Sequence, residues 1–135
     1  EEFQKNPTDW HKFHIANTEF ALGNLNEAKE LYSAILQSSE LSEDSKELSL
    51  LRLHQIALKL DDYGYIEKNL NVKFKNMNYE GLRLFIASAY YLQIGELSKA
   101  YSSSLSAKSC NSSLVDANLL DKSIAVLHQN INKFR

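Results

Sequence analysis

The sequence is poor in the residues that break helices and in those that favour strands. It contains one proline and four glycines in 135 residues, and valine is scarce where leucine is abundant. Proline and glycine disfavour helix interiors and valine favours strands, so this balance predicts an all-α protein. Hydrophobic residues make up 44% and charged residues 24%, which is typical of a globular chain with a packed core.

Further shortages limit the classes of function. Cys110 is the one cysteine and has no partner for an internal disulfide, so cytoplasmic and periplasmic locations both stay open. No run of about 18 apolar residues is present, and we therefore expect no membrane insertion. A net charge of -2, without a basic patch interleaved with aromatic residues, predicts no nucleic-acid binding. Composition leaves the oligomeric state unknown.

A pair of apolar stripes joined at a glycine occupies residues 13 to 36. Ala16 and Ala28 fall where two helices would cross, with larger apolar residues above and below them. Helices that pack about 8 to 10 Å apart need small side chains at the crossing. Gly23 stands between the stripes, and glycine can end a helix in a left-handed conformation. The segment is therefore predicted to be a helical hairpin.

The same pattern returns near the other end of the chain. Ser88, Gly95 and Ala100 repeat the spacing of Ala16, Gly23 and Ala28, and Asp61 stands at the turn of a less regular hairpin between the two. At these places the chain has a small residue in the first helix, a glycine at the turn and an alanine in the second helix. In this pattern it resembles the tetratricopeptide repeat.

The resemblance implies one domain, 1–135, folded as a right-handed superhelix of antiparallel hairpins, an α-solenoid of about seven helices. Its expected parts are repeats at about 8–38, 43–75 and 79–109 and a capping helix at about 113–133.

The resemblance also implies a concave surface lined by the first helix of each hairpin. Its residues are mostly apolar, and we expect them to be partly exposed. An apolar groove of this size implies either docking of a protein or peptide partner, as a helix or an extended segment, or cover by another part of the chain itself. The expected partner-binding residues are Trp10, Phe13, Asn17, Phe20, Leu48, Leu51, Gln55, Leu82 and Phe85.

The chemistry-bearing residues are few and scattered. His11 and His14 lie one turn apart, but two ligands do not close a metal site, and His54 is expected on a packed face. We therefore expect no catalytic, metal or cofactor site, and a noncatalytic scaffold or adaptor is the leading function. Two alternatives stay open. One is a helical docking domain of a larger assembly or secretion or envelope factor whose activity lies outside this chain. The other is an enzyme with a perturbed cluster around these three histidines.

Overall fold

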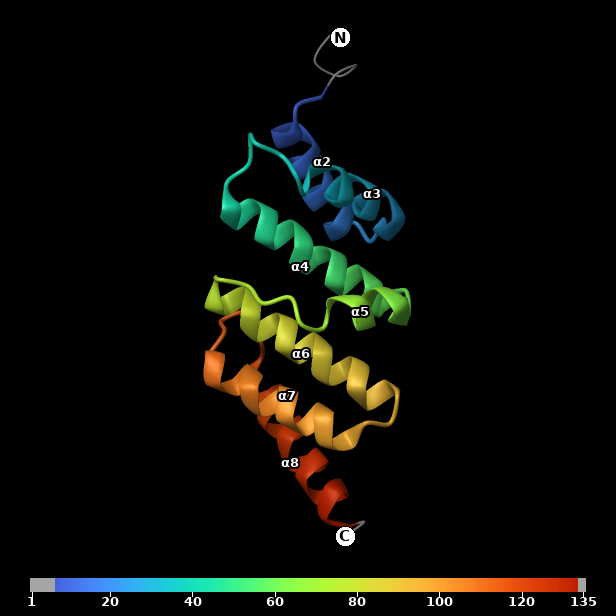
Figure 1. Ribbon diagram of the computed structural model, residues 1–135, viewed down its shortest axis with the longest axis vertical. Coiled ribbons are helices and arrows are strands. Elements are labelled where there is room, and N and C mark those ends of the chain that lie inside the picture. Colours follow the sequence, from blue (N-terminus) through green and yellow to red (C-terminus); the bar gives the residue numbers. More distant parts are fainter. Residues whose placement is uncertain (1–6, 134–135) are drawn as a thin grey trace. The chain divides into compact units, whose positions relative to one another are not determined.

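The computed structural model describes residues 7–133, and its regular structure there is entirely helical (Figure 1). No strand occurs between these residues, so the prediction of an all-α chain is confirmed. None of the helices found there is both long and apolar enough to cross a membrane. The helices are α2 (Asp9–Ala21), α3 (Leu25–Ile35), α4 (Glu43–Lys59), α5 (Tyr63–Asn69), α6 (Met77–Gln93), α7 (Leu97–Cys110) and α8 (Ala117–Lys133).

The chain divides into two compact units, and the boundary falls inside α4. The first unit ends at Ile56 and the second begins at Ala57. Helices α2 and α3 and most of α4 therefore belong to the first unit. The end of α4 and helices α5 to α8 belong to the second.

Helices α2 and α3 form the first predicted hairpin. The Oγ1 atom of Thr8 accepts a hydrogen bond from the backbone N–H of His11 at 3.1 Å, which caps the start of α2. Gly23 has a φ of 84°, the left-handed conformation that the turn requires. Ala16 and Ala28 are fully buried, and Figure 1 shows the two helices side by side. The predicted turn and crossing are confirmed.

Acidic residues separate α4 from α5. Asp61 has a φ of 56°, which ends α4 in the left-handed region that asparagine and aspartate tolerate. Asp62 Oδ1 then accepts a hydrogen bond from the Tyr65 N–H at 3.2 Å and caps α5. The middle turn therefore uses this pair in place of a glycine, as predicted.

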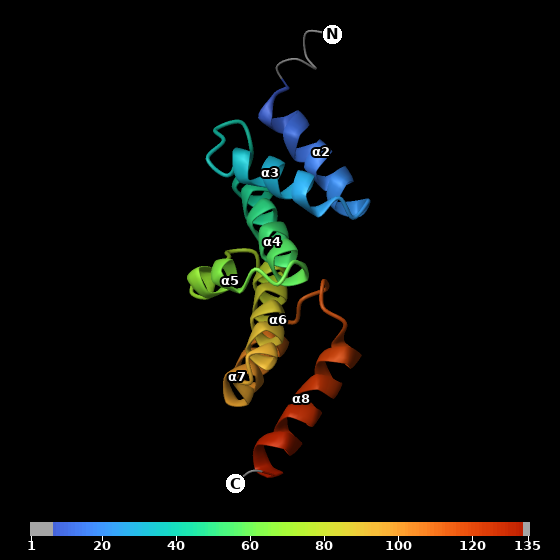
Figure 2. The same ribbon diagram turned by 90° about the vertical axis from the view of Figure 1, so that its right-hand side faces the viewer.

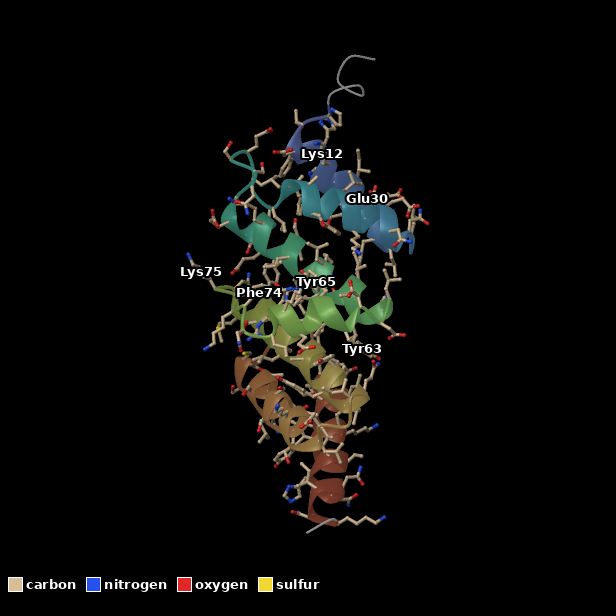
Figure 3. All side chains as sticks on the ribbon, turned by 45° about the vertical axis from the view of Figure 1, so that its right-hand side comes forward. Lys12, Glu30, Tyr63, Tyr65, Phe74 and Lys75 are labelled. Atoms are coloured by element: carbon tan, nitrogen blue, oxygen red, sulfur yellow. The ribbon has the colours of Figure 1, made fainter. Side chains whose placement is uncertain are left out.

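Helix α5 ends at Asn69, six residues before the end of the repeat expected at about 43–75, so the last part of that repeat is not helical as we expected. The chain beyond α5 makes its hydrogen bonds to side chains of α6. Arg83 Nη1 donates to the Leu70 carbonyl at 2.8 Å, and the Phe74 N–H donates to Glu80 Oε1 at 3.0 Å. Phe74 is buried, whereas Figure 3 shows Lys75 reaching outward. These contacts take the place of a further helical turn.

The core of the second unit begins where α4, α5 and α6 meet. Ala57, Ile66 and Tyr90 are buried together there, and Tyr63 and Tyr65, labelled on α5 in Figure 3, pack against them. Burial and the nearby charge of Asp62 raise the pKa of Tyr65 to about 12. These contacts hold the short α5 against α6 although seven residues make a marginal helix in isolation.

Helices α6 and α7 form the third predicted hairpin (Figure 1). Gly95 has a φ of 81°, and Ala100 is fully buried. Ser104 stands where the repeat pattern has a large apolar residue, yet it too is fully buried. The Ser88 hydroxyl donates to the Ala100 carbonyl at 2.9 Å and lies 2.6 Å from the Ser104 hydroxyl. The crossing is therefore filled by two small, hydrogen-bonded side chains.

The loop before α8 packs directly on the first turns of α6. A Cβ atom added to Gly81 would lie 2.6 Å from the Cβ of Ser112 and 3.1 Å from that of Cys110. The Ser112 hydroxyl donates to the Asn78 carbonyl at 2.7 Å, and the Ser113 N–H donates to Asn78 Oδ1 at 3.0 Å. Glycine is needed at position 81 because the two backbones approach so closely.

Helix α8 begins at Ala117, four residues later than the expected start at about 113. Asp116 Oδ1 caps it by accepting a hydrogen bond from the Leu119 N–H at 3.1 Å. Leu120 and Leu127 are buried, which confirms that one face of this helix packs inward. Figure 2 shows α8 on one side of the α6–α7 hairpin.

Candidate functional site

The predicted apolar residues of the first unit differ widely in exposure. Trp10 on α2 is 51% exposed, whereas Phe13 and Leu51 are 6% and 0% exposed. The expectation of a partly exposed surface is therefore wrong for Phe13 and Leu51, whose side chains belong to the core. Leu48 and Phe20 are partly buried.

The predicted polar residues of the first unit are held in an internal network. The Tyr32 hydroxyl donates to Asn17 Oδ1 at 2.6 Å, and Arg52 Nη1 donates to Gln55 Oε1 at 2.6 Å. The Arg52 guanidinium also lies over the Phe20 ring, 4.8 Å from its centre. Burial raises the pKa of Tyr32 to about 12 although the nearby Arg52 lowers it. These residues therefore tie α2, α3 and α4 of the first unit together.

The two predicted residues of the second unit, Leu82 and Phe85, are both partly buried on α6. Phe85 lines a cavity of about 410 Å³ between α6 and α8, which we call the α6–α8 groove. Three large apolar residues in its walls are more than half exposed: Leu92 at 52%, Leu119 at 53% and Val126 at 55%. The other lining residues are Ser88, Ala89, Lys122, Ser123, Leu127 and Asn130.

The spacing of the lining residues makes the groove elongated. On α8 they run from Leu119 to Asn130 at helical intervals, which spans about three turns or about 16 Å. On α6 they run from Phe85 to Leu92, about two turns or about 10 Å. Both walls contain small side chains between the large ones, so a bulky group from outside can enter between the helices.

The groove carries positive charge without a matching carboxylate. Lys122 is the one charged residue among the lining residues. The nearby acidic residues are engaged elsewhere: Asp116, just before α8, caps the helix, and Asp121 Oδ1 on α8 lies 3.0 Å from Lys108 Nζ on α7. Within residues 7–133 no carboxylate lies within ion-pair distance of Lys122. An acidic group from outside would meet no competing anion in the walls.

The histidines have packing or hydrogen-bonding contacts in the fold. His14 packs edge-on against Trp10 with ring centres 4.4 Å apart, and His11 Nδ1 lies 3.0 Å from Thr8 Oγ1. His54 is buried, and its Nδ1–H donates to the Leu50 carbonyl at 2.8 Å. Over the described part of the chain, no three His, Cys, Asp or Glu side chains are grouped so that they could hold a metal ion.

Sequence reasoning missed a buried ion pair that braces α6. Arg83 Nε and Nη2 donate to the two carboxylate oxygens of Glu80, each at 2.6 Å. Burial alone would raise the pKa of Glu80, but the hydrogen bonds from Arg83 and the Phe74 N–H, with the charges of Arg83 and Lys73, outweigh it and lower that pKa. The available signal was an acid and a base three residues apart on an otherwise apolar helix.

The exposed wall of α8 was also missed. Leu120 and Leu127 form the buried stripe of this helix, and Leu119 and Val126 form a second, exposed stripe beside it. A helix that is apolar on two faces indicates a second surface to cover.

Comparisons with models of protein families, with curated proteins and with solved structures find no match. The evidence for a function is therefore the geometry of the α6–α8 groove.

Proposed function

We propose that this chain is a noncatalytic protein-interaction module, a scaffold or adaptor, that docks a segment of a partner protein in the α6–α8 groove. The observation that carries the proposal is the exposure of Leu92, Leu119 and Val126 along one cavity. Apolar side chains exposed singly need no explanation, but a continuous apolar trough between two helices is typical of a binding groove.

The proposal moves the docking surface away from most of the residues expected from the sequence. Phe85 alone among those nine lines the groove. Phe13 and Leu51 are core residues, and Asn17 and Gln55 have hydrogen-bonding partners inside the first unit. Trp10 is an exposed aromatic residue on α2 and is not one of the residues that line this cavity.

The proposed fold is a short α-solenoid of the tetratricopeptide type. Its support is the agreement between the two regular hairpins. Gly23 and Gly95 have nearly equal positive φ angles, and Ala28 and Ala100 are both fully buried at the crossings. In such a solenoid the last helix covers the preceding hairpin, which is the position of α8.

A peptide-display selection tests the function. Peptides of 15 to 20 residues (roughly four to five helical turns) would be selected on the wild-type protein. Each would then be measured on Val126→Asp and on Leu105→Asp. Leu105 is a matched control because it is 43% exposed on α7 and does not line the groove. Both changes place the same charge on an exposed helix position, so only the groove distinguishes them.

We expect the selected peptides to bind the wild type and Leu105→Asp alike and to lose at least tenfold in affinity on Val126→Asp, since docking would have to remove a carboxylate from water in the middle of an apolar contact. Circular dichroism and thermal melting would show that both variants stay folded. Peptides that bind all three proteins equally would refute docking in this groove.

A further inference from the structure

The shape of the α6–α8 groove favours one kind of occupant over others. Its walls extend along two to three helical turns, and they leave Leu92, Leu119 and Val126 more than half exposed. Pockets for small molecules usually enclose most of the ligand surface, and a trough with walls this exposed does not. An amphipathic helix fits better, because it lays apolar side chains at i, i+3, i+4 and i+7 into a groove of this length.

The charge of the groove indicates which charged side chain such a helix would carry. Lys122 is exposed, lies on the α8 wall and has no acidic neighbour at ion-pair distance in the described structure. Lys133 follows eleven residues later, about three turns along the same side of α8. Two lysines therefore lie on this side of α8, while the acidic Asp121 is paired with Lys108.

The following inference rests on the proposed function. We propose that the docked segment is an amphipathic helix with an acidic side chain beside its apolar stripe, placed to pair with Lys122. The apolar stripe supplies most of the affinity by covering Leu92, Leu119 and Val126. The acidic residue fixes the direction and register of the helix, because charge pairs at a rim contribute specificity more than affinity.

A second copy of this chain matches the groove less well. In a twofold pairing each partner presents the same patch, and this patch contains Lys122 and no carboxylate among its lining residues. Neither lysine would gain a partner, and two like charges would approach each other.

The test uses a groove-dependent peptide and versions of it in which its acidic residues are changed to glutamine or to lysine. Affinity would be measured by fluorescence anisotropy on the wild-type protein, on Lys122→Glu and on Lys99→Glu. Lys99 is the matched control: it lies on α7, with its Nζ 5.8 Å from the centre of the Tyr91 ring, and does not line the groove.

We expect the glutamine peptide to bind about two- to fivefold more weakly than the acidic one at low salt, with the difference shrinking as salt is added. Lys122→Glu should reverse the order, so that the lysine peptide binds better than the acidic one, and Lys99→Glu should keep the wild-type order.

Each remaining outcome overturns the inference in a distinguishable way. If the three peptides bind alike and Lys122→Glu changes nothing, while Val126→Asp still abolishes binding, the acidic partner is wrong and groove docking stands. If no peptide depends on Val126, the proposed function fails as well. If the wild type sediments as a dimer that Val126→Asp dissociates, the occupant is a second copy.

Discussion

Replacing Gly81 by alanine should force the first turns of α6 away from the loop that leads into α8. The new Cβ would lie 2.6 Å from the Cβ of Ser112 and 3.1 Å from that of Cys110, well inside the separation of about 3.5 Å at which carbon atoms make favourable contact. Both neighbours are Cβ atoms, so they can retreat only if their backbones move. Alanine gains about 1 kcal/mol over glycine in a helix interior, and overpacking costs about 1 to 3 kcal/mol. The net loss of stability should be about 1 kcal/mol.

Urea unfolding followed by circular dichroism would measure this loss. Gly64→Ala is the matched control, because Gly64 also lies in a helix and an added Cβ there meets only Asp62 Oδ1, at an ordinary 3.8 Å. That variant should be neutral or gain up to about 1 kcal/mol. If Gly81→Ala is as stable as Gly64→Ala, the close approach of α6 and the α8 loop is not present in solution.

Three further changes test the packing of the fold. Ala28→Leu should lower the free energy of unfolding by about 1 to 3 kcal/mol, since this side chain is fully buried at the first crossing; a loss below about 0.5 kcal/mol in urea unfolding would contradict that crossing. Glu80→Gln should flatten the acid limb of the stability profile. The pKa of Glu80 is lowered from 4.5 in the fold, so its carboxylate stabilises the native state above about that pH and this contribution is lost as the pH falls further; equal pH profiles for the two proteins between pH 2 and 6 (roughly two units either side of the ordinary carboxyl range) would show that the ion pair contributes nothing. Ser88→Ala should cost about 1 to 3 kcal/mol because it leaves the buried Ser104 hydroxyl without this neighbour, and the double change to alanine should cost less than the sum of the single changes.

The parts of the fold that sequence predicted are those decided by neighbouring residues. Gly23 and Gly95 end their helices because only glycine takes a positive φ without strain, and Asp61 serves the same purpose less well. Ala28 marks a crossing because a larger side chain would hold the helices apart. Such signals are local, so they can be read along the chain.

The parts that sequence missed depend on contacts between distant segments. No residue in the stretch 70–75 indicates by itself that the chain leaves the helix there. The chain does so because Glu80 and Arg83 on α6 form hydrogen bonds with backbone groups of this stretch. The close packing around Gly81 comes from Ser112, which is distant in the sequence and near in the fold.

The burial of two of the expected site residues could not be predicted for a related reason. Apolar residues on the first helix of each hairpin predict a surface, but their pattern does not say which of them the hairpin itself will cover. Phe13 and Leu51 are covered, whereas Leu119 and Val126 on α8 are not. Packing of α7 against α8 decides which stripe of α8 is buried, and a helical wheel alone shows two stripes without ranking them.

The most direct test of the docking claim is a titration of methyl-labelled protein with a selected peptide, followed residue by residue by NMR. We expect the largest shifts at the methyl groups of Leu92, Leu119 and Val126, with little change at the exposed Leu22 and Leu105, which lie outside the groove. Shifts confined to the first unit, with those three methyl signals unmoved at saturation, would contradict the assignment of the α6–α8 groove as the docking site.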